Sequence, residues 1–191
     1  MRGVLLLLPL TLWAADRPVP PVAQKFLNLF QELRQAEAQP QTGRRHVSFS
    51  LSEQEINAYL RYMLRATPRP GLDSVTVRIF PYNYVSSLTV IDYDEIERWR
   101  PGTIPGLFEL LLHGKQSILL DGRFAVADSM ITFSVEKAYY GRLWLPAFLV
   151  EKVIRMVAAR QPEHYDTSRP LPLPFGLRRV WTGDGMIRGN N

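Results

Sequence analysis

The sequence contains no cysteine. The chain therefore has no disulfide framework, no thiolate metal site and no catalytic thiol. A lipoprotein anchor is also excluded, because that anchor is attached to a cysteine. The net charge of +5 is a mild excess. No basic run carries interleaved aromatic residues, and this argues against a nucleic-acid-binding protein.

Recognisable catalytic and metal-binding motifs are also missing. The histidines lie far apart in the sequence, at His46, His113 and His164, and lack the spacing of a zinc site. The serines of residues 48–52 have no glycine-flanked elbow. The glycines form neither a phosphate loop nor a dinucleotide-binding motif. We therefore predict no metal, no cofactor and no enzymatic activity, although catalytic residues can converge from distant positions.

One acidic cluster, Asp92, Asp94 and Glu95, has two interpretations. Neighbouring carboxylates can bind a metal or carry out acid–base catalysis. Acidic residues at the start of a helix are also favoured by N-capping and by the helix dipole. We prefer the structural interpretation of this cluster.

The long apolar run of the chain lies at its N-terminus. Arg2 precedes the apolar residues 4–12, and Trp13, Ala14 and Ala15 follow before Asp16. This order is typical of a cleaved signal peptide, and the run is shorter than the about 20 residues of a membrane-spanning helix. A buried N-terminal helix is the alternative. We predict a signal peptide over residues 1–15, a single domain over residues 16–191, and a periplasmic or extracellular location.

Two amphipathic helices are predicted in the first third of the chain. The first covers residues 22–38, and its apolar stripe is Phe26, Leu29, Phe30 and Leu33. The second begins after Ser52, because Ser52 and Glu55 have the spacing of a capping box. Its predicted buried stripe is Ile56, Tyr59, Leu60, Met63 and Leu64.

The region over residues 116–160 predicts a β-hairpin that leads into a third helix. In the first strand, alternation places Ile118, Leu120, Phe124 and Val126 on one apolar face. In the second strand, it places Ile131, Phe133, Val135 and Tyr139 on one apolar face. Residues 127–129 favour a turn, and Gly141 favours a bend or bulge. Pro146 suits the first turn of a helix, which we expect to continue to Val157.

The remaining segments predict shorter elements. Strands are expected over residues 75–79 and 84–91, and short helices over residues 92–99 and 105–113. The proline-rich segment 161–174 should be extended, with few sheet hydrogen bonds. A terminal hairpin follows around residues 183–185. This order predicts an α+β fold, in which a curved, mostly antiparallel sheet packs against one or two long amphipathic helices.

Aromatic residues are concentrated near the predicted strand ends. They are Phe80, Tyr82, Tyr84, Tyr93, Trp99, Tyr139, Tyr140, Trp144 and Phe148. Core and sheet packing explains many such residues. A curved sheet wrapped on a helix can also leave an apolar groove. We select five as candidate ligand-binding residues: Phe80, Tyr82, Tyr139, Trp144 and Phe148.

Several stretches resemble exported bacterial proteins of the tubular lipid-binding (TULIP-like) group. They are residues 51–60 (LSEQEINAYL), 122–124 (GRF), 131–135 (ITFSV) and 145–146 (LP) ahead of the last helix. The resemblance implies a curved antiparallel sheet wrapped around a long helix and, for several members, lipid binding. It carries over no catalytic residue.

The sequence leads to three functional hypotheses. The first is an exported non-enzymatic protein that binds a lipid or acyl chain in a groove between sheet and helix. The second is a structural or assembly protein of the cell envelope, whose aromatic surface contacts an envelope protein or a membrane surface. The third is an envelope hydrolase.

Overall fold

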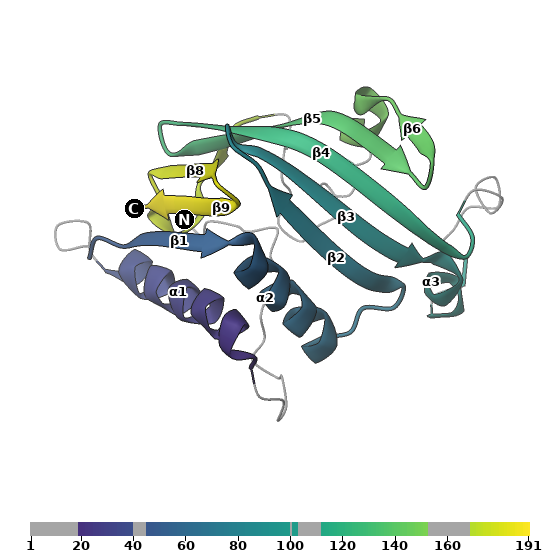
Figure 1. Ribbon diagram of the computed structural model, residues 1–191, viewed down its shortest axis with the longest axis horizontal. Helices are drawn as coiled ribbons and strands as arrows, with labels where there is room; N and C mark the ends of the chain where they lie inside the picture. The colour runs from purple at the N-terminus through teal and green to yellow at the C-terminus, as the bar shows by residue number, and fades with distance from the viewer. Residues whose placement is uncertain (1–18, 40–44, 100, 103–111, 153–168) are drawn as a thin grey trace.

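The structure is a computed structural model that describes residues 19–39, 45–99, 101–102, 112–152 and 169–191. It is an α+β fold with two antiparallel sheets and helices packed below them (Figure 1). The predicted fold class is therefore confirmed. The predicted signal peptide, the helix over residues 105–113 and most of the proline-rich segment lie outside the described residues.

The larger sheet has the strand order β2-β3-β4-β5-β6 (Figure 1). Its strands are β2 (Leu72–Ile79), β3 (Tyr84–Asp92), β4 (Lys115–Ala127), β5 (Met130–Tyr140) and β6 (Leu143–Leu145). The short helix α3 (Tyr93–Trp99) follows β3. Strand β7 (Leu171–Pro172) pairs with the start of β5. This short pairing agrees with the expectation that the proline-rich segment makes few sheet hydrogen bonds.

Tight turns connect the strands of the two long hairpins. Tyr82 and Asn83, between β2 and β3, have φ angles of 61° and 59°, and Asp128 and Ser129, between β4 and β5, have 51° and 60°. Positive φ at both central positions matches the right-handed twist of the flanking strands. The predicted turn over residues 127–129 is therefore present, and both turns hold neighbouring strands in register.

A β-bulge in β5 changes which side chains share a face. Asp121 pairs with Lys137 but Gly122 pairs with Val135, so one residue of β5 is left over at this point. After the bulge it is Ala138, and not Tyr139, that lies on the face of Val135. Our placement of Tyr139 with the apolar residues of β5 was therefore wrong. Gly141 forms the turn before β6 instead of the bulge.

The smaller sheet has the order β1-β9-β8, with β1 (Ser48–Ser52), β8 (Arg179–Gly183) and β9 (Met186–Asn190). The terminal hairpin β8–β9 was predicted. Its pairing with β1 was not, because that contact joins segments far apart in the sequence (Figure 1). Such non-local pairing leaves no periodic signal in either segment.

The core lies where the two sheets meet the helices α1 (Pro21–Ala38) and α2 (Glu53–Ala66). Its main buried cluster consists of Leu33, Ala36, Val47, Phe124, Leu173, Leu177 and Val180. A second cluster joins the two helices, where Tyr59 stacks on Phe26 with ring centroids 4.0 Å apart. On α2 the buried residues are Asn57, Ala58 and Tyr59, whereas Leu60 is half-buried. The predicted stripe thus correctly includes Tyr59 but leaves out the buried Asn57 and Ala58.

The predicted capping box at the start of α2 is present. The Ser52 hydroxyl accepts a hydrogen bond from the Glu55 N–H at 3.2 Å, and the Glu55 carboxylate accepts one from the Ser52 N–H at 2.7 Å. The other Glu55 oxygen lies 2.8 Å from Lys25 Nζ on α1. Burial raises the pKa of Glu55, but the hydrogen bonds from Lys25 and Ser52 and the Lys25 charge together lower that pKa below its ordinary value.

Glu55→Gln should therefore destabilise the fold in a pH-dependent way. A carboxyl group with a lowered pKa stabilises the folded state fully above its ordinary pKa, and this contribution disappears as pH falls through the folded-state pKa. We expect a loss of about 0.5–1 kcal/mol at pH 7, shrinking toward pH 3, measured by urea unfolding. Glu32→Gln removes an exposed charge on α1 and is the matched control. An equal loss at both pH values would contradict the assignment.

Candidate functional site

The five candidate ligand-binding residues do not form one site. Phe80 and Tyr82 lie at the β2–β3 turn, whereas Tyr139, Trp144 and Phe148 lie at the opposite edge of the larger sheet. Strands β2 and β6 are separated by four inter-strand steps, or roughly 19 Å at about 4.8 Å per step. The two groups therefore lie at separate places on the molecule.

Residues at the β2–β3 turn connect the two sheets through hydrogen bonds. The Thr182 hydroxyl on β8 donates a hydrogen bond to the Phe80 carbonyl at 2.7 Å, and the Thr182 N–H donates to the Asn83 side chain at 2.9 Å. The Phe80 ring packs edge-on against Tyr84. Tyr82 is exposed. These contacts are structural, and they give Phe80 a role in holding β8 against the larger sheet.

The second group lies in a stretch with four exposed apolar residues, which we call the edge patch. It consists of Leu143, Trp144, Phe148 and Leu149, with exposed fractions of 57%, 58%, 70% and 41%. Trp144 pairs with the half-buried Tyr139 across β5 and β6.

Phe148 and Leu149 lie in the helical turn that follows β6. Residues 147–152 are helical, and the Leu149 N–H donates to the Pro146 carbonyl at 3.0 Å. This agrees with the predicted helix start at Pro146. The rest of that helix lies outside the described residues. The basic residues Arg142 and Lys152 flank the edge patch in sequence, and both are exposed.

The acidic cluster has structural partners. Asp92 accepts a hydrogen bond from the Glu95 N–H at 3.0 Å and so caps α3. Asp94 accepts from the Gly114 N–H at 2.8 Å, and Glu95 from the Gly71 N–H at 3.0 Å. These bonds support the capping interpretation.

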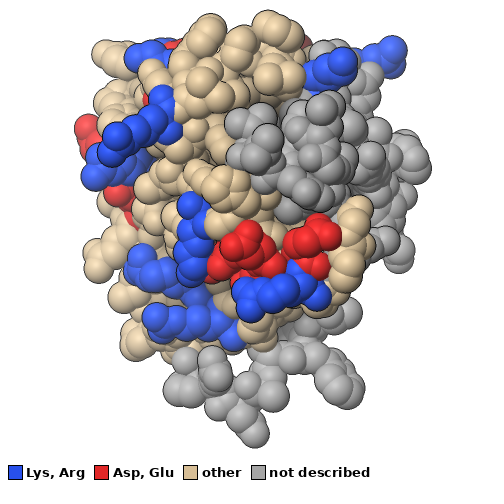
Figure 2. Space-filling view, turned by 90° about the vertical axis from the view of Figure 1, so that its right-hand side faces the viewer, with Lys and Arg blue, Asp and Glu red and all other residues tan. Residues whose placement is uncertain are grey.

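Acidic and basic side chains lie next to each other at the end of the molecule where α3 lies (Figure 2). One such pair joins Lys115 Nζ to Asp73 at 2.6 Å. Across the described ranges no group of three or more His, Asp or Glu residues is placed to hold a metal ion.

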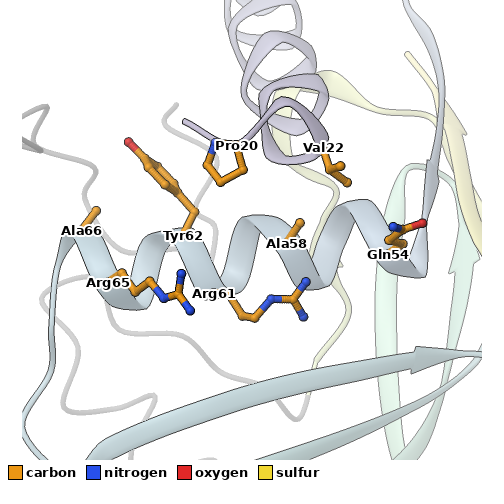
Figure 3. Close-up of a pocket in the computed structure, with 8 residues that line it drawn as sticks. All are labelled: Pro20, Val22, Gln54, Ala58, Arg61, Tyr62, Arg65 and Ala66. Carbon is orange, nitrogen blue, oxygen red and sulfur yellow. The ribbon is translucent and has the colours of Figure 1, made fainter. Parts of the chain in front are cut away.

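A hollow of about 460 Å³ lies between the start of α1 and the length of α2. Its lining residues are Pro20, Val22, Gln54, Ala58, Arg61, Tyr62, Arg65 and Ala66. Figure 3 shows Ala58 and Tyr62 directed toward Pro20 and Val22, with Arg61 and Arg65 extending along the adjacent side of α2.

We did not predict this hollow from the sequence. The available signal was two arginines four residues apart on a predicted helix, which places them on one face. A second hollow, of about 450 Å³, lies beside α1 and β1. None of the five predicted residues lines either one.

No helix among the described residues is long and apolar enough to span a membrane.

His46 contacts the terminal Asn191 carbonyl at 3.2 Å and the Ser48 hydroxyl at 3.1 Å, which is a structural arrangement.

We found no protein family model, curated protein or solved structure that matches this chain. The resemblance to the TULIP-like group therefore stays a prediction.

Proposed function

We propose that this is an exported, non-enzymatic protein that binds a lipid or acyl chain through the edge patch. The observation that carries the proposal is the exposure of four large apolar side chains within seven consecutive residues, 143–149. Large exposed apolar side chains gathered in one short segment suit a binding site for a protein, a membrane or a ligand. Single exposed apolar residues would need no such explanation.

The composition of the edge patch favours a lipid. Tryptophan has an apolar ring and a polar N–H, and it is enriched where a protein meets the membrane–water interface. Arg142 comes directly before the patch and is exposed, whereas the exposed Lys152 follows it beside the exposed Glu151. A basic residue close to exposed aromatic side chains, as Arg142 is to Trp144, suits an anionic lipid surface. The predicted export signal and the TULIP-like resemblance agree with this function.

The first measurement is whether the parent protein binds a fluorescent fatty-acid probe at micromolar concentration. Trp144→Ala combined with Phe148→Ala should then weaken probe binding by at least about tenfold, because each large apolar contact contributes about 1–3 kcal/mol. Trp99→Ala combined with Trp181→Ala also removes two exposed aromatic side chains, but outside the patch, and should leave probe binding unchanged.

Three other outcomes would overturn the proposal. A parent protein that binds no probe would exclude the lipid function. A double variant that changes only the association state would identify the patch as a protein interface, as in the envelope-assembly hypothesis. A double variant that unfolds at much lower urea would identify the two side chains as core residues.

A further inference from the structure

Two arginines on α2 lack a partner in the part of the chain that the structure describes. Arg61 and Arg65 are exposed and form no hydrogen bond or ion pair with a described residue. By contrast, Lys25 pairs with Glu55 at 2.8 Å, and Arg123 pairs with Glu136 at 2.8 Å. The α2 pair is therefore available to a charge from outside the chain.

The positions of the two arginines leave an unbalanced positive charge. Residues four apart on a helix are neighbours, and like charges at this spacing repel each other. Arg65 lies in the last turn of α2, where the helix dipole favours a cation. The stabilisation by the helix dipole falls off within the last turn, so it does not extend to the charge of Arg61. A bound anion would relieve the repulsion for both residues.

The rest of the hollow is mostly apolar. Pro20 and Val22 form one side, and Ala58, Tyr62 and Ala66 form the other. No acidic residue is among the described residues that line it. Its volume of about 460 Å³ lies toward the lower end of the range for small-molecule sites, roughly 300–1,000 Å³. This size favours one aliphatic chain over two.

We propose that the hollow between α1 and α2 is a second ligand site, which binds a carboxylate carrying a single aliphatic chain. The guanidinium groups of Arg61 and Arg65 hold the carboxylate, because their forked donors match its two oxygens. The chain lies against Ala58, Tyr62 and Val22. The site goes beyond the lipid-binding function proposed above, because no residue of the edge patch lines the hollow.

Calorimetric titration with decanoate, decanol and acetate tests this assignment on the full chain. Decanol keeps the aliphatic chain without the charge, and acetate keeps the charge without the chain. Arg61→Gln combined with Arg65→Gln should weaken decanoate binding by about 10- to 100-fold, the loss expected for hydrogen bonds between charged groups. Decanol binding should be the same in the parent and in this variant.

Arg78→Gln combined with Arg179→Gln is the matched control. Both arginines are exposed and lie outside the hollow, so this variant removes the same charge and should bind decanoate as the parent does. Trp144→Ala combined with Phe148→Ala should also keep the decanoate site, so failure of the edge patch and failure of the hollow give different results.

Four results would overturn the assignment: no decanoate binding by the parent, equal affinity for decanoate and decanol, equal affinity for decanoate and acetate, or equal losses in the two arginine variants. A second measurement uses the parent alone and does not depend on the variants. Decanoate should shift the methyl resonances of Val22, Ala58 and Ala66 in NMR spectra. Shifts confined to Leu143 and Leu149 would place the ligand at the edge patch instead.

Discussion

Phe124→Ala should lower the free energy of unfolding by about 3–5 kcal/mol, the usual cost of removing a large aromatic side chain from a core. Phe124 is 7% exposed and belongs to the buried cluster that joins α1, β4 and β8. Truncation removes its apolar contacts and leaves a cavity between the two sheets. Urea unfolding followed by circular dichroism measures the loss.

Phe133→Ala provides a closely matched control. Phe133 lies directly opposite Phe124 across β4 and β5, but it is 46% exposed. The same chemical change should therefore cost much less at Phe133. Equal losses at the two positions would mean that the contact of β4 with the smaller sheet does not stabilise the fold.

Asn57→Ala should also destabilise the fold strongly, through hydrogen bonds and not through packing. The Asn57 side chain donates to the Val77 carbonyl at 2.7 Å and accepts from the Val77 N–H at 2.8 Å. Asn57 thus takes the place of a neighbouring strand along β2, and it is only 6% exposed. Removing it leaves both Val77 groups without these bonds, at a cost of about 1–3 kcal/mol for each.

Hydrogen exchange gives a local readout of this prediction. The Val77 amide should exchange faster in Asn57→Ala, because its acceptor has been removed. The Ile79 amide donates to Glu53 at 3.0 Å and should change less. Gln54→Ala, at an exposed position on the same helix, should change neither stability nor exchange. Unaltered protection of Val77 would contradict the role of Asn57.

Sequence patterns of short range predicted the helices and hairpins well. The start of α2 was predictable because Ser52 and Glu55 satisfy each other's backbone groups within four residues. The turn at Asp128 and Ser129 was predictable because Asp and Ser side chains can hydrogen-bond to their own backbone in turns. In both cases the physical cause lies entirely within the segment.

The same patterns failed where a second segment changed the result. Alternation assigned Tyr139 to the inner face, but the bulge beside Gly122 reversed the faces of β5 beyond it. A bulge depends on how two strands pair, so the alternation of one strand does not reveal it. Asn57 is absent from the predicted buried stripe of α2, and only its contact with β2 explains its burial.

The candidate sites also depend in part on local sequence and in part on tertiary contacts. Trp144 and Phe148 were selected from sequence, but the sequence did not determine whether such residues are buried or exposed. The hollow with Arg61 and Arg65 forms only because α1 packs beside α2.

The sequence by itself determined the helices α1 and α2, the two long hairpins and the terminal hairpin, because local hydrogen bonds and side-chain periodicity specify them. Only the tertiary structure decided the pairing of β9 with β1 and the separation of Phe80 and Tyr82 from Trp144 and Phe148. It also decided the position of the arginine-lined hollow. These features depend on contacts between segments far apart in the chain. The free energy of such a contact depends on the residues of both segments, so neither segment alone specifies it.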